Sequence, residues 1–480
     1  MIQFFKLGSL DRFFLLLVLF GLIHGPFLWI SDHILVPELY WIRLGERLSQ
    51  GWRLYAQALD ETGPLPALIY AGLYRLGLAD FHVFRIIGAA MVLLQALWIN
   101  QMVHRLQLIS ERNFLVAFFY LLLMHTGPDS VSLSPVLIAN WFLLFATARF
   151  FKILKDGASS DDAMVLGLWM GLAFLSYQPT LLFLLPIYIS SLLFTGLRPN
   201  QYLLMLVAAL LPATAAYTFF LVGGGESEFW TCFLAPINPV SKVNLVDWDL
   251  FLGLGVLLVL IALLGWVVAN QNSRVNFQRL GFTVFFFSLL AAAITLFFGT
   301  RLSTERLVLL VPAASFFAAQ FMVYTKGVLF QEILGLFCAI LFLGGFYGMS
   351  DFSFGKQILG HRLFAEDPPK GFMANFLHKP ILVLDEDARF LKYNPLATRF
   401  NRFYLSGLDK NLSQTHEGLI FWYQCLAEDA PVLIYDPHQF MTQVAVRIPE
   451  FGRCYKSSFY PHLYELRPGK RFGVGELRKK

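Results

Sequence analysis

The sequence predicts an all-α polytopic membrane protein that carries a small α/β unit at its C-terminal end. Three observations support this fold class: 57% of the 480 residues are hydrophobic, only 14% are charged, and the mean hydropathy is +0.60. A water-soluble protein cannot hide so much apolar surface, so most of the chain must face lipid or a bundle interior. The net charge of +5 is modest, and it gives no reason to expect nucleic acid as a partner.

The transmembrane helices are predicted by apolar segments suited to crossing about 30 Å of hydrocarbon. About eleven such segments centre on residues 11–30, 83–103, 114–127, 131–148, 163–177, 179–195, 201–222, 250–269, 280–298, 307–325 and 329–347. The first ends in Trp29-Ile30-Ser31-Asp32, without a small-x-small cleavage site. We therefore interpret it as the first membrane helix and not as a signal peptide.

The orientation follows from the basic residues of the short loops. With the N-terminus inside, the short outer loops after the first one hold only Lys242, Arg301 and Arg306. The inner loops hold Arg105, Arg112, Arg149, Lys152, Lys155, Arg198, Arg274, Arg279 and Lys326. We therefore expect a bacterial inner-membrane protein whose first loop, residues 32–81, and whose C-terminal tail both face outward.

The chain divides into a membrane module, residues 1–349, and an outer α/β domain, residues 350–480, where the composition becomes that of a soluble protein. Short apolar runs at 381–384 and 431–435 predict buried strands that end at Asp385 and Asp436. Residues 413–428 predict an amphipathic helix, and residues 454–466 predict one or two edge strands. Cys425 and Cys454 either form a disulfide or remain two buried thiols, and the sequence leaves both alternatives open.

The first loop concentrates the polar chemistry of the membrane module. It contains Pro37-Glu38-Leu39-Tyr40, then Gly51-x-x-x-Tyr55, then Asp60-Glu61-Thr62-Gly63-Pro64-Leu65. Acids, bases and aromatic residues at a membrane surface are typical of a catalytic loop. Residues 36–50 are also expected to form a helix with an apolar side.

These motifs, taken in order, resemble the GT-C fold membrane glycosyltransferases, which include protein O-mannosyltransferases and the aminoarabinose transferases of lipid A. The resemblance continues in Leu166-Gly167-Leu168-x-x-Gly171 with Gln178-Pro179, and in Glu305-Arg306-Leu307 leading to Pro312. In the tail, Val383-Leu384-Asp385 and Ala397-Thr398-Arg399-Phe400 resemble the outer domain of some bacterial members.

The resemblance implies an inverting hexosyl- or pentosyltransferase that moves a sugar from a polyprenyl-phosphate donor to an acceptor hydroxyl outside the membrane. The acceptor would be a glycan, a lipid or a protein. A carboxylate must take the proton of the attacking hydroxyl, and cations must offset the charge that grows on the departing phosphate.

Glu38 is the first candidate for the catalytic base, although Pro37 stands where the family usually has an Asp. Asp129, in the short outer loop before the fourth span, is the second catalytic candidate. Glu38 and Asp129 together are also the candidate ligands of a divalent cation, Mg²⁺ or Mn²⁺, because hard cations prefer carboxylate oxygens.

Seven further residues are candidates for binding the substrates. Carboxylates before Gly63-Pro64 match the family's segment near the donor phosphate, arginines offer forked donors to phosphate oxygens, and aromatic rings can stack on a sugar. The candidates are Asp60, Glu61, Arg85, Arg301, Arg306, Tyr40 and Tyr55. For the two tyrosines, as for Trp41 and Trp52, an aromatic belt at the membrane interface is the favoured alternative interpretation.

Other functions stay open at this point. A polymerase or ligase of lipid-linked glycans would share the outward site. Such an enzyme would be expected to have one large outer loop late in the bundle, whereas the longest late loop here, residues 223–249, is short. A transporter would more often show internal repeats. A non-catalytic membrane scaffold is the third alternative, since fold alone is weak evidence for activity.

Overall fold

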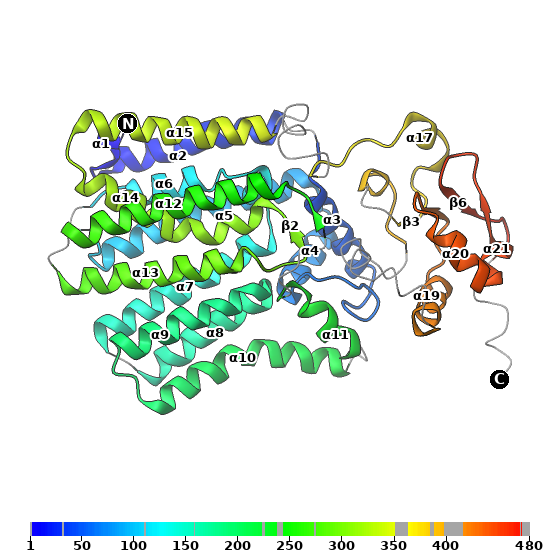
Figure 1. The fold of residues 1–480 in the computed structure, drawn as a ribbon, viewed down its shortest axis with the longest axis horizontal. Coiled ribbons are helices and arrows are strands. Elements are labelled where there is room, and N and C mark those ends of the chain that lie inside the picture. Colours follow the sequence, from blue (N-terminus) through cyan, green and yellow to red (C-terminus); the bar gives the residue numbers. More distant parts are fainter. Residues whose placement is uncertain are drawn as a thin grey trace.

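The computed structural model describes residues 2–30, 33–109, 112–157, 159–222, 226–237, 243–272, 275–350, 363–384, 388–397, 416–470 and 472. Long helices lie side by side in one bundle, and the C-terminal sheet region lies beyond one end of it (Figure 1). The chain is therefore a helical membrane protein with a small C-terminal α/β part, as the sequence predicts.

The bundle contains every segment that the sequence predicts as a span. Its helices are α1 (Ile2–Phe5), α2 (Leu10–Ile30), α5 (Phe81–Arg105), α6 (Leu115–Leu123), α7 (Pro135–Asp156), α8 (Ser160–Ser176), α9 (Leu184–Phe194), α10 (Pro199–Val222), α12 (Trp248–Asn272), α13 (Asn276–Thr295), α14 (Val311–Tyr324) and α15 (Val328–Ser350). The 3-10 turns η1 (Pro128–Val131), η2 (Gln178–Phe183) and η4 (Thr304–Leu310) precede α7, α9 and α14.

Eight helices in the described part of the chain are long and apolar enough to cross a membrane. The other three predicted spans fall on α6, on α8 and on the continuous segment η2–α9, which are shorter. At 1.5 Å per residue, α6 is only about 14 Å long, which is about half of the hydrocarbon thickness. All nine of its residues are buried, so α6 packs inside the bundle and not against lipid.

Close contact between α8 and α10 depends on two glycines one turn apart. A Cβ added to Gly167 would lie 2.2 Å from the carbonyl oxygen of Met205, and one added to Gly171 would lie 2.4 Å from that of Ala209. Small residues at this spacing let membrane helices approach backbone to backbone. This part of the family-like motif therefore has a packing role.

One end of the bundle carries the first loop and two short helices within it. These are α3 (Val36–Ser49), which corresponds to the helix expected at 36–50, and α4 (Pro64–Arg75), and they pack against each other (Figure 1). At the same end lie α11 (Glu226–Phe233), the turn η3 (Ala235–Ile237) and the short parallel pair β1 (Val243–Asn244) and β2 (Arg301–Leu302).

The tail forms a four-stranded sheet in the order β3-β4-β6-β5. Strands β3 (Ile381–Val383) and β4 (Leu433–Tyr435) are parallel, β4 pairs antiparallel with β6 (Leu463–Leu466), and β6 with β5 (Tyr455–Ser457). The described part of the tail also contains the helical elements α17 (Lys370–Phe376), η5 (Ala388–Leu391), α20 (Phe440–Arg447) and α21 (Pro449–Cys454), together with α19 (His416–Glu428). Both predicted strands are confirmed, and α19 confirms the predicted helix over its described residues.

Residues 454–466 form two strands, of which β5 lies at the edge of the sheet, as predicted, and β6 pairs on both sides. Cys425 and Cys454 are both buried and form no disulfide with each other, so the alternative of two buried thiols is the one that holds. Asp385 lies outside the described residues, whereas Asp436 accepts hydrogen bonds from the Phe440 and Met441 N–H groups and caps α20.

Helix α3 connects the bundle to the tail. The Val36 N–H donates to the Leu363 carbonyl at 2.8 Å, and the Arg43 guanidinium donates to the Leu391 carbonyl at 2.8 and 3.0 Å. Further along, Arg47 lies 3.0 Å from a carboxylate oxygen of Asp429. The first loop is therefore held between the two parts of the chain.

Candidate functional site

Three loops meet around a small cavity at the tail-facing end of the bundle. They are the segment after α3, the junction of α8 with η2, and the segment that connects α13 to η4. The residues that line the cavity are Glu61, Thr62, Gly63, Pro135, Ser176, Tyr177, Gln178, Pro236, Gly299, Thr300, Arg301, Glu305 and Arg306. Of the sequence candidates, the structure thus brings Glu61, Arg301 and Arg306 together.

The acidic pair of the first loop is fixed by local hydrogen bonds. The Thr62 N–H donates to a carboxylate oxygen of Asp60 at 2.7 Å, and the Tyr55 hydroxyl donates to the Thr62 carbonyl at 2.8 Å. A Cβ on Gly63 would lie 2.2 Å from the Leu175 carbonyl oxygen. Only glycine therefore lets this turn lie directly against the end of α8.

Glu61 is the acidic side chain that the first loop presents to the cavity. It is buried, and a side-chain hydrogen bond joins it to Thr300. Burial raises the pKa of Glu61 from its usual value of 4.5 to about 7, although the charges of Arg301 and Arg306 oppose this rise. A carboxylate with a pKa near neutrality can accept a proton and release it again.

Arg301 supplies a buried positive charge at the cavity wall. Its Nε lies 3.2 Å from a carboxylate oxygen of Glu305, and its guanidinium lies over the Trp41 ring, 5.4 Å from the ring centroid. The backbone of Arg301 belongs to β2, which pairs with β1. The side chain is thereby positioned from α3, from η4 and from a two-stranded sheet.

Arg306 is held mainly by backbone carbonyl groups. Its guanidinium donates to the Leu296 carbonyl at 3.1 Å and to the Arg301 carbonyl. Gly299 has a φ of +127°, and a Cβ there would lie 2.7 Å from a guanidinium nitrogen of Arg306. The glycine makes room for the arginine, whose charge faces the same cavity as Glu61.

Glu305 lines the cavity and belongs to the Glu305-Arg306-Leu307 motif, but it is not among the site residues predicted from the sequence. One carboxylate oxygen accepts a hydrogen bond from Ser303 at 3.1 Å and pairs with Arg301. The other oxygen is buried and has no hydrogen-bond partner among the described residues. The sequence signal for Glu305 is its position next to Arg306. An acid beside one predicted phosphate-binding arginine is well placed to orient a second arginine.

Asp129 lies next to this cluster, behind its η4 wall. The Thr304 hydroxyl donates to one of its oxygens, and a Cβ on Gly127 would collide with that hydroxyl. Burial and the charge of Glu305 raise the pKa of Asp129 from 3.8 to about 7. Its Oδ2 is buried and has no hydrogen-bond partner among the described atoms, so a polar group remains to be satisfied there.

Glu38 and Arg85 are brought together in a separate place. The Arg85 guanidinium donates to both carboxylate oxygens of Glu38 at 2.9 Å, and the Leu35 N–H donates to one of them at 3.1 Å. Neither side chain is exposed at all. Arg85 also donates to the His33 carbonyl, so this buried pair ties α5 to the start of α3.

The engagement of Glu38 bears on the expected metal site. Both of its oxygens already accept charge-assisted hydrogen bonds, and the described residues contain no group of three or more His, Cys, Asp or Glu placed to hold a metal ion. Metal use therefore stays a prediction that the geometry of Glu38 does not favour.

The candidate sugar-stacking tyrosines are buried inside the protein. Tyr40 is 1% exposed and packs in the hydrophobic cluster between α3 and the tail. Tyr55 is fully buried, and its ring lies 5.0 Å from that of Phe220 and 5.4 Å from that of Phe229. Trp41 is also buried, so these three rings do not form an aromatic belt at a lipid surface.

Comparisons with solved structures identify the fold to which this site belongs. No family model matches the sequence, and no curated protein matches it. Among solved structures, ArnT from Cupriavidus metallidurans bound to undecaprenyl phosphate superposes with a TM-score of 0.54 at 13% identity, over 89% of this chain and 94% of that one. The oligosaccharyltransferase of Archaeoglobus fulgidus in its apo form superposes with a TM-score of 0.51 at 10% identity, over 90% of this chain and 68% of that one.

A further match, to AglB of Archaeoglobus fulgidus in complex with an inhibitory peptide and a dolichol-phosphate, has a TM-score of 0.45 at 11% identity and covers 70% of this chain. The chain spans 55% of the length of that protein. At these identities the likeness concerns the fold. The bundle with its loop-built cavity and C-terminal α/β part has the GT-C fold of membrane glycosyltransferases.

Proposed function

We propose that this chain is an inverting membrane glycosyltransferase that moves a hexosyl or pentosyl unit from a polyprenyl-phosphate donor to an acceptor hydroxyl. The observation that carries the proposal is the buried set of acids and arginines around one cavity, where loops meet helix ends. Buried charges at such a depth are costly and are retained mainly for function. The shared fold with ArnT, which was solved with undecaprenyl phosphate bound, supports a lipid-linked donor.

We place the catalytic base at Glu61 in preference to Glu38. Glu61 lines the cavity and has a pKa of about 7, whereas both Glu38 oxygens are occupied by Arg85. In the proposed step, an acceptor oxygen attacks the anomeric carbon from the side opposite the phosphate, Glu61 takes the hydroxyl proton, and the bond from carbon to phosphate oxygen breaks. The polyprenyl phosphate leaves with the bonding electrons.

Arg301 and Arg306 then offset the charge that develops on the leaving phosphate. An arginine at this place needs no change in protonation, and its planar donors suit phosphate oxygens. Glu305 orients Arg301 at the cavity wall, and Asp129 holds the Thr304 hydroxyl from behind that wall. The cavity holds ≈ 20 Å³, room for about one water molecule, so the surrounding loops must separate when the donor headgroup and the acceptor enter.

The same proposal includes a topology. The cavity end of the bundle faces outward from a bacterial inner membrane, together with an outer domain of residues 350–480, while residues 1–349 form the membrane module. The positive-inside rule supports this orientation, because the cations of the inner loops, Arg105, Arg112, Lys155, Arg198 and Lys326, lie at the opposite ends of their helices.

The test is a transfer assay in membranes that contain the overexpressed chain. Labelled polyprenyl-phosphate sugars are compared with labelled nucleotide sugars as donors, in the presence of envelope acceptors. Label should move from the lipid donor, and Glu61→Gln should lower the rate by on the order of 100-fold or more, the usual contribution of a general base. Asp80→Asn, an exposed acid at the end of the same loop, is the matched control and should be fully active.

Two outcomes would contradict the proposal in different ways. Consumption of nucleotide sugars alone would exclude a polyprenyl-phosphate donor. Full transfer by Glu61→Gln, with consumption of the lipid donor, would leave the activity standing and remove Glu61 as its base.

A further inference from the structure

A large cavity lies at the other end of the bundle, far from the loop-built site. It has a volume of ≈ 680 Å³ and is formed by α2, α5, α7 and the segment before α6. The residues that line it are Gly8, Phe13, Leu94, Leu97, Trp98, Asn100, Gln101, His104, Arg105, Arg112, Asn113, Phe114 and Trp141. Nothing in the proposed transfer reaction uses them.

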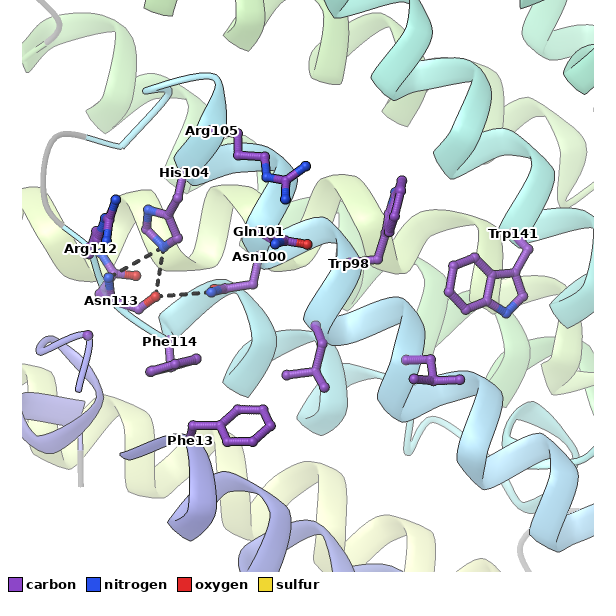
Figure 2. A pocket seen from close by; sticks show the side chains of 13 residues that line it. Phe13, Trp98, Asn100, Gln101, His104, Arg105, Arg112, Asn113, Phe114 and Trp141 are labelled. Atoms are coloured by element: carbon purple, nitrogen blue, oxygen red, sulfur yellow. Dashed lines mark hydrogen bonds between the residues drawn. The ribbon is translucent and has the colours of Figure 1, made fainter. Parts of the chain in front are cut away.

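The cavity changes character along its length. Figure 2 shows Arg105, Arg112 and His104 gathered toward one end, with Trp98 and Trp141 toward the other. Leu94, Trp98, Gln101 and Arg105 recur on α5 at helical spacing, so one face of the helix carries the whole gradient. Such a gradient from cations to apolar side chains matches an amphiphilic ligand.

The length of the gradient matches one leaflet of a bilayer. Leu94 and Arg105 are separated by eleven residues of α5, or about 16 Å at 1.5 Å per residue. Half of a hydrocarbon core of about 30 Å is about 15 Å. The cavity therefore extends from the headgroup level at Arg105 to about the middle of the membrane.

A second hollow adjoins the first and shares three of its residues, Trp98, Gln101 and Arg105. It has a volume of ≈ 370 Å³ and runs between α5 and α7 past Lys152 and Lys155. Most residues of the second hollow are polar or charged, among them Lys152, Lys155 and Asp156, so it widens the cationic end of the first cavity. The apolar part of the first cavity, which ends near the middle of the membrane, fits the acyl chains of a phospholipid from one leaflet.

The polar end is built from ordered groups and carries net positive charge. The Asn113 carbonyl accepts hydrogen bonds from Asn100 at 3.1 Å and contacts His104 Nε2 at 2.7 Å, which fixes the segment that holds Arg112. Arg105 and Arg112 are exposed on this end. Among the described residues of the neighbouring walls, the acids are Asp156, in the second hollow, and Asp162, which already pairs with Arg149 and Lys152.

We propose that this paired cavity is a binding site for an anionic glycerophospholipid, with its phosphate between Arg105 and Arg112 and its chains along Trp98 and Trp141. Basic pockets between membrane helices recognise such headgroups by charge, and each nearby cation contributes about 1 kcal/mol. The inference concerns the bundle alone and does not depend on the proposed transferase activity.

The test measures lipid retention by native mass spectrometry of the full-length purified protein. Detergent-solubilised protein is titrated with dioleoylphosphatidylglycerol or with dioleoylphosphatidylcholine. Wild-type protein should retain one phosphatidylglycerol in strong preference to phosphatidylcholine. The double variant Arg105→Gln/Arg112→Gln should bind it on the order of 30-fold more weakly, equivalent to about 2 kcal/mol.

Two further variants separate a specific site from general surface charge. Arg198→Gln/Lys326→Gln removes two exposed cations at the same end of the bundle but outside the cavity, and it should retain the lipid as wild type does. Leu94→Trp fills the apolar half and keeps both arginines, so it should weaken retention. Lipid retention by Leu94→Trp therefore tests the site even if the double arginine variant fails to fold.

Several results would overturn the proposal. Equal retention of the two phospholipids would remove the preference for an anionic headgroup. The same loss in the Arg198→Gln/Lys326→Gln control would assign the effect to overall charge, and unchanged retention in both cavity variants would place the lipid elsewhere. Displacement of phosphatidylglycerol by an equal amount of undecaprenyl phosphate would reject the assignment to a phospholipid.

Discussion

The buried pair of Glu38 and Arg85 offers the sharpest test of which acid does chemistry and which maintains structure. Arg85 donates to both Glu38 oxygens at 2.9 Å, and both side chains are completely buried. Removing one partner of such a pair leaves an uncompensated buried charge and typically costs 3–5 kcal/mol. We therefore expect Glu38→Gln to destabilise the protein by about 3 kcal/mol, at the low end of this range, because the amide still accepts one hydrogen bond.

The double variant Glu38→Leu/Arg85→Met removes the pair without leaving a charge behind. Apolar replacements of similar volume are often neutral or stabilising, and Phe27 and Phe81, whose rings lie 4.9 Å from the Arg85 guanidinium, provide an apolar setting for methionine. The double variant should therefore regain most of the stability that Glu38→Gln loses. The two effects are read from thermal unfolding in detergent, where the single variant should lower the Tm by on the order of 5 °C.

The same variants are then assayed for transfer of sugar from the lipid donor. If Glu38 only maintains structure, the double variant is as active as wild type once its folded fraction is matched. A folded double variant with no transfer would refute this reasoning and return the role of base to Glu38.

The remaining predictions concern the cavity itself. Because burial holds the pKa of Glu61 at about 7 against 4.5 for an ordinary glutamate, the native state retains a proton that the unfolded chain loses. The contribution of Glu61 to stability therefore falls between about pH 4.5 and 7 by on the order of 3 kcal/mol, and Glu61→Gln should reduce the fall of Tm over this range. A fall of the same size in both proteins would contradict this. Gly299→Ala should displace the Arg306 guanidinium, since the new Cβ would lie 2.7 Å from it, and should reduce transfer at least tenfold, whereas Gly196→Ala, which meets no atom within 4 Å, should not.

Hydropathy predicts the positions of the helices well because crossing a bilayer imposes a length and a composition that are local to each segment. All predicted spans coincide with helices, and Glu61 does converge with Arg301 and Arg306. Their convergence follows from topology: alternate loops of an antiparallel bundle meet at the same end. Hydropathy does not reveal that α6 is short, because an apolar segment buried in protein has the same composition as one buried in lipid.

Pairing between side chains is where sequence reasoning has least power. Glu38 and Arg85 are 47 residues apart, and each on its own looks like a free charge at a membrane surface. The tyrosines pose the same problem, since Tyr55 matches a sugar-stacking residue in type but is enclosed by Phe220 and Phe229. Which charge remains available is decided by tertiary packing, so the structure moves the proposed base from Glu38 to Glu61.

Helix α3 makes the cavity and the tail mechanically dependent on each other. Trp41, on its bundle side, lies beneath the Arg301 guanidinium, while Arg43 and Arg47 on the same helix hold η5 and the residue that follows α19. A helix cannot shift at one of these contacts without moving the other, because its backbone hydrogen bonds make it a stiff element over 14 residues. Any opening that admits a lipid headgroup to the Arg301 wall must therefore either keep α3 in place or carry the tail with it.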